Sequence, residues 1–79
     1  MKESARYAKV VVWSEEDHCY IGRAPGLLDG GCHGQDEGAV FEELCQIVEE
    51  VIQLYHEDGK ELPPPTSGLD YASEAQAMT

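Results

Sequence analysis

The chain has 79 residues, with five Lys or Arg against sixteen Asp or Glu, so its formal net charge at pH 7 is −11. Nucleic-acid binding takes most of its affinity from Lys and Arg that neutralise phosphates, so the composition argues against direct binding of DNA or RNA. An anionic membrane surface is disfavoured for the same reason. A strongly acidic protein is better suited to a basic protein partner.

The length allows one domain with a thin core, and domains of this size are commonly stabilised by a metal, by disulfides or by a second subunit. Three cysteines, Cys19, Cys32 and Cys45, are an odd number without the spacing of a disulfide framework. The N-terminus lacks the apolar stretch of a secretory signal, and no apolar run reaches the length of a membrane span. We therefore expect a cytoplasmic protein with reduced cysteines.

The first predicted element is a strand over residues 7–13 (YAKVVVW), which are rich in β-branched and aromatic residues. Both of its faces are largely apolar, with Val10 and Val12 on one face and Val11 and Trp13 on the other. We expect a helix to cover one face of the sheet and a second copy of the chain to cover the other, in a homodimer.

The polar residues 14–17 predict a hairpin loop, and residues 18–24 (HCYIGRA) predict the returning strand. Pro25 and Gly26 end this strand, because proline cannot donate to a β ladder. The glycine-rich residues 29–34 are expected to contain a short third strand.

The strongest signal is a helix over residues 37–57, where apolar residues recur at helical spacing. Asp36 is the expected N-cap, Gly59 the residue just beyond the C-terminus, and the prolines at 63–65 prevent continuation. The apolar stripe is predicted to consist of Phe41, Leu44, Val48, Val51 and Tyr55, with Val40, Ile47 and Leu54 beside it.

These elements predict an α+β domain over residues 5–65, in which one long helix packs on one face of a three- to four-stranded antiparallel sheet. Residues 66–79 are small and mostly polar, and we interpret them as a C-terminal tail.

The order of the elements and several short motifs resemble the HicB family of antitoxins over roughly residues 7–65. The similar motifs are Tyr20-Ile21-Gly22, Ala24-Pro25-Gly26-Leu27, Gly31-Cys32, Phe41-Glu42-Glu43-Leu44, residues 47–55 (IVEEVIQLY) and residues 58–63 (DGKELP). Two features differ. Gly38-Ala39-Val40 replaces the family's usual glycine, acidic residue and threonine before the helix. The DNA-binding module that often follows the prolines is replaced by residues 66–79, so operator binding is not expected.

The resemblance implies a degraded ribonuclease-H-like fold and a role in a type II toxin–antitoxin system. In such a system the chain binds a small basic HicA-like toxin that cleaves messenger RNA, and masks its active face. Two alternatives stay open. One is an orphan HicB-like regulatory or scaffold module that binds another protein. The other is a metal- or ligand-binding protein that uses Cys19, Cys32 and His33.

We expect no catalysis, because the carboxylates lie in the predicted loop and along the helix exterior rather than converging on divalent ions. We also expect no metal or cofactor, because neighbours such as Cys32 and His33 point to opposite faces of a strand. The candidate protein-binding residues are Trp13, from the first strand, and Glu42, Glu43, Glu49 and Glu50, from the outer face of the helix.

Overall fold

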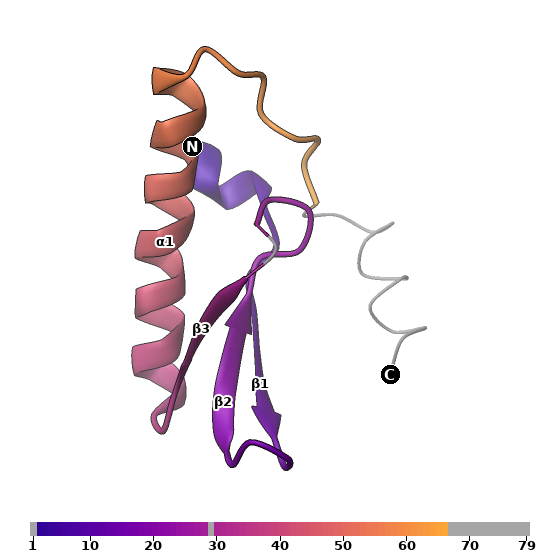
Figure 1. The fold of residues 1–79 in the computed structure, drawn as a ribbon, viewed down its shortest axis with the longest axis vertical. Helices are drawn as coiled ribbons and strands as arrows, with labels where there is room; N and C mark the ends of the chain where they lie inside the picture. Colours follow the sequence, from indigo (N-terminus) through magenta and orange to yellow (C-terminus); the bar gives the residue numbers. More distant parts are fainter. Residues whose placement is uncertain (1, 29, 67–79) are drawn as a thin grey trace.

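The computed structural model describes residues 2–28 and 30–66, and it confirms the α+β architecture (Figure 1). Three antiparallel strands form a sheet in the order β1-β2-β3, and one long helix packs across one face of it. The predictions for residues 67–79 lie outside the described residues. The elements in chain order are the 3₁₀ helix η1 (Glu3–Arg6), β1 (Val10–Ser14), β2 (Cys19–Arg23), β3 (Gly31–Gly34) and α1 (Glu37–Glu57).

The bounds of α1 are those that the sequence predicts, and local chemistry fixes both ends. At the N-terminus, Asp36 accepts a hydrogen bond from the backbone N–H of Ala39 at 2.8 Å, which satisfies one of the unpaired donors of the first turn. At the C-terminus, Gly59 adopts a φ of 68°, and the N–H of Lys60 donates to the carbonyl of Tyr55 at 2.9 Å. This is the Schellman arrangement that ends many helices at a glycine.

The buried face of α1 follows a row of residues spaced four apart, Val40, Leu44, Val48 and Ile52. The prediction that Phe41 belongs to the core stripe is wrong, since its exposed fraction is 45%. Around the helix axis Phe41 points in nearly the same direction as Val48, but it lies about two turns closer to the N-terminus of α1, so a shared direction does not bury it. Leu54 is also exposed, at 56%, because it is two residues from the buried Ile52 and therefore points to nearly the opposite side of the helix.

A glycine in β2 lets the helix approach the sheet. Gly22 is paired with Val11 of β1 and Cys32 of β3, and all three positions face α1. A Cβ atom at Gly22 would lie 3.1 Å from both Cys32 Sγ and Val40 Cγ1, which is closer than packed side chains normally come. The contact between helix and sheet therefore depends on a missing side chain at the middle strand.

The first strand begins at Val10 rather than at residue 7. Tyr7 instead follows η1, a short helix that the sequence did not predict, and its side chain enters the core with an exposed fraction of 2%. The residues around it bond to the segment after α1 instead of to β2. The N–H of Thr66 donates to the Arg6 carbonyl at 3.0 Å, and the N–H of Ala8 donates to Thr66 Oγ1 at 2.9 Å.

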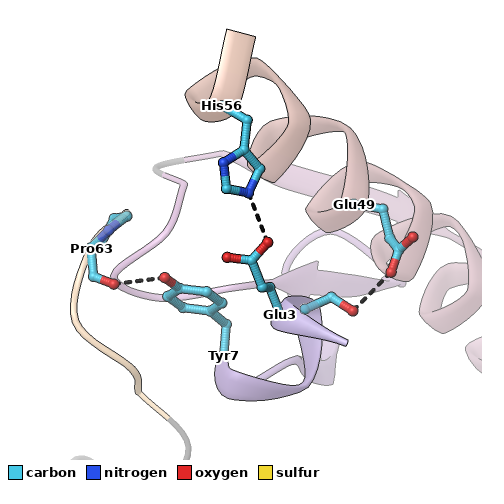
Figure 2. Close-up of polar contacts among 6 residues, drawn as sticks. Glu3, Tyr7, Glu49, His56 and Pro63 are labelled. Carbon is cyan, nitrogen blue, oxygen red and sulfur yellow. Dashed lines mark hydrogen bonds and ion pairs between the residues drawn. The ribbon is translucent and has the colours of Figure 1, made fainter. Parts of the chain in front are cut away.

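Further contacts connect the N-terminal segment to the end of α1 and the prolines (Figure 2). The Tyr7 hydroxyl donates to the Pro63 carbonyl at 2.6 Å, and Glu3 Oε1 lies 2.7 Å from His56 Nε2. The N-terminal segment before β1 and the proline segment after α1 are thus joined by hydrogen bonds.

A substitution in the buried row tests this packing. Leu44 is fully buried, so we expect Leu44→Ala to lower the free energy of unfolding by about 2–5 kcal/mol, through lost contacts and the cavity left behind. Leu54→Ala removes the same atoms from an exposed site and should change stability by less than about 0.5 kcal/mol. Urea denaturation followed by circular dichroism measures both. Equal losses in the two variants would contradict the assigned core.

Candidate protein-binding site

The outer face of α1 carries most of the candidate residues. Because Val40, Leu44 and Val48 are buried where α1 packs on the sheet, the opposite side of the helix points into solvent. The exposed polar residues there define what we call the acidic face, and the first and last lie about 22 Å apart along the helix axis. These residues are Glu42, Gln46, Glu49, Glu50, Gln53 and Glu57.

Glu49 stands at one border of the acidic face and is engaged within the protein. Its carboxylate accepts a hydrogen bond from Ser4 Oγ at 2.8 Å (Figure 2) and lies 3.9 Å from Lys2 Nζ. The ion pair with Lys2 is exposed and contributes little to stability. The local positive charge nevertheless reduces the contribution of Glu49 to the negative field of the helix.

Glu43 is separated from the acidic face by its interaction with β3. The Cys32 thiol is buried, with the Val40 carbonyl as a hydrogen-bond acceptor at 3.5 Å. Burial raises the pKa of Cys32, and a hydrogen bond with Glu43 and the negative charge of Glu43 raise this pKa further. The thiol is therefore neutral near pH 7, which makes it a poor nucleophile. Of the four predicted glutamates, Glu42 and Glu50 remain as the best available for a partner.

Trp13 lies on the sheet and not on the acidic face. It is the fourth residue of the edge strand β1, its exposed fraction is 44%, and its ring meets that of Tyr20 edge to face with centroids 5.0 Å apart. The structure therefore does not combine Trp13 and the glutamates into one continuous surface, because the acidic face is on the side of α1 away from the sheet.

Phe41 is an exposed aromatic residue that the sequence reasoning assigned to the core. It precedes Glu42 directly, but consecutive residues of a helix point about 100° apart, so Phe41 does not belong to the acidic face. Aromatic residues with a large exposed area are enriched among the residues that dominate binding at interfaces. The spacing of apolar residues carries no signal for this exposure, because Phe41 and the buried Val48 are seven residues apart and point in nearly the same direction around the helix axis.

The cysteines and histidines do not form a cluster. Cys32 faces α1, whereas Cys19 and His33 face the other side of the sheet, as alternation along the strands requires. Within residues 2–28 and 30–66 there is no group of three or more His, Cys, Asp or Glu that could hold a metal ion. The same part of the chain contains no helix with the length and apolar character needed to cross a membrane.

Comparison with known proteins adds no relative: no family model, no curated protein and no solved structure matches the chain.

Thiol reactivity tests the role of Glu43. Cys45 is partly exposed and Cys32 is buried, so we expect iodoacetamide at neutral pH to modify Cys45 well before Cys32. Removing the charge in Glu43→Gln lowers the pKa of Cys32 and should speed its modification, because more thiolate is present. Peptide mass spectrometry follows each site. Glu42→Gln serves as the matched control, and equal effects of the two substitutions would contradict the assigned contact.

Proposed function

We propose that the chain is a HicB-like antitoxin, which neutralises a small basic HicA-like toxin in the cytoplasm by direct binding, without catalysis or a cofactor. The observation that carries the proposal is the acidic face of α1, a row of outward-pointing carboxylates on a helix that the core holds rigidly. The sequence resemblance to HicB antitoxins supports it independently.

The physical basis is competition for one surface. A toxin that cleaves messenger RNA must present cationic groups to the phosphate backbone. The carboxylates of Glu42 and Glu50, about two turns apart on α1, offer negative charge that can occupy that surface in place of RNA. Opposite net charges also accelerate the encounter, and this acceleration weakens as salt screens the charges.

Packing of α1 on the sheet also favours binding of a partner. Because the core fixes the helix backbone, little order is lost when the acidic face meets a partner.

Co-expression tests the function itself. If a small basic protein encoded next to this chain is the toxin, its expression alone should arrest growth, and co-expression of this chain should restore growth. The two proteins should also co-purify. Failure both to restore growth and to form a complex would contradict the antitoxin proposal and leave the orphan binding module as the better interpretation.

Charge reversal tests the acidic face as the binding surface. We expect the double variant Glu42→Lys/Glu50→Lys to weaken the complex by at least about 30-fold, because like charges then meet across the interface. The control Glu15→Lys/Glu16→Lys changes the net charge by the same amount at the β1–β2 turn. Isothermal titration calorimetry measures both affinities. If the two variants lose affinity equally, only the overall charge matters, and the acidic face is not the site.

A further inference from the structure

The face of the sheet opposite α1 is covered by no element within the described residues. By the register of the strands, the residues on this open face are Val10, Val12, Ser14, Cys19, Ile21, Arg23, Gly31 and His33. A groove of about 600 Å³ runs over β2 and β3 on this side, and its lining includes Asp17, Ile21 and Arg23. Val12 has an exposed fraction of 39%, so apolar surface is available for a partner.

The charge of the open face differs from that of the rest of the molecule. None of its eight strand residues is acidic, although the chain carries a net charge of −11. Arg23 is exposed and forms no ion pair with another described residue. A second copy of this chain can therefore approach here with the least electrostatic repulsion, while the two acidic faces stay on opposite outer sides.

We propose that the open face binds the open face of a second copy, so that two sheets stack with the two α1 helices outside. Two sheets that pack face to face in this way bury the side chains of both inner surfaces. A two-fold axis makes every contact occur twice, which suits a surface that is apolar in the centre and charged at its ends.

Charge also selects the orientation of the two copies. Asp17 lies in the turn before β2, and Arg23 is the last residue of that strand, so the two charges stand at opposite ends of β2, whose five residues span about 13 Å. If the two β2 strands run in parallel, Arg23 meets the partner's Arg23. If they run antiparallel, Arg23 meets the partner's Asp17, and the two-fold axis repeats this pair. The dimer is therefore antiparallel, with Ile21 near its centre.

The inference goes beyond the proposed function, because the acidic faces remain free on the outside of the dimer. Three strands of four or five residues present a small surface, so we expect dissociation constants in the micromolar range. The dimer can then carry two toxin molecules, one on each α1.

Sedimentation equilibrium of the full chain over a range of micromolar concentrations tests the dimer. Val12→Asp should raise the dissociation constant by at least about 30-fold, because an unpaired charge is then buried in the interface. Leu54→Asp adds the same charge to another exposed apolar residue, on α1, and should change the dissociation constant by less than about twofold. Circular dichroism verifies that each variant is folded.

A charge exchange tests the orientation. Arg23→Asp and Asp17→Arg should each weaken the dimer about 10-fold or more, and the double variant should recover affinity to within about threefold of the original chain. A monomeric original chain would overturn the proposal, as would equal effects of Val12→Asp and Leu54→Asp. A double variant that stays as weak as the single ones would overturn the antiparallel arrangement.

Discussion

The structure depends on the contact between α1 and the middle strand of the sheet. Val40 and Leu44 pack over Gly22, where an added Cβ would lie 3.1 Å from Val40 Cγ1 and 3.4 Å from Leu44 Cδ2, so helix and sheet are in close contact. A small domain has few buried residues from which to gain stability. This contact therefore sets the position of α1, and with it the direction in which the acidic face points.

The two ends of the domain reinforce that position. The helix ends at Gly59, and the proline segment returns over the N-terminal residues, where Tyr7 donates to Pro63 and Thr66 bonds to the backbone next to Tyr7. Glu3 and Ser4 in turn contact His56 and Glu49 on α1. The outcome is a helix and a sheet held together with two contrasting surfaces: an acidic helix face and a partly apolar sheet face that carries Arg23 and no acidic strand residue.

Much of this architecture could be predicted from the sequence, because short stretches of neighbouring residues determine where its helix and strands end. Asp36 and Gly59 mark the ends of α1 through capping chemistry, and Pro25 and the polar turn separate the strands. The sequence predictions fail where contacts between distant parts of the chain determine the structure. Tyr7 has strand-forming chemistry, but its partners are Pro63 and the residues around Thr66, more than fifty positions away. Such pairing leaves no periodic signal.

The candidate site was predictable only in outline. The pattern of polar residues places Glu42, Glu49 and Glu50 on the outside of the helix, but it does not show that Ser4 engages Glu49 or that Glu43 reaches towards Cys32. Both contacts join segments far apart in the chain. The exposure of Phe41 is not visible in the sequence pattern either, because Phe41 points in nearly the same direction around the helix axis as the buried Val48.

Carboxyl footprinting of the complex with its basic partner tests the central claim, that α1 binds through its acidic face. Carbodiimide labelling followed by mass spectrometry reports the accessibility of each carboxylate with and without the partner. The account predicts that Glu42 and Glu50 become protected while Glu15 and Glu16 stay accessible. Protection of the turn with no change on α1 would contradict it.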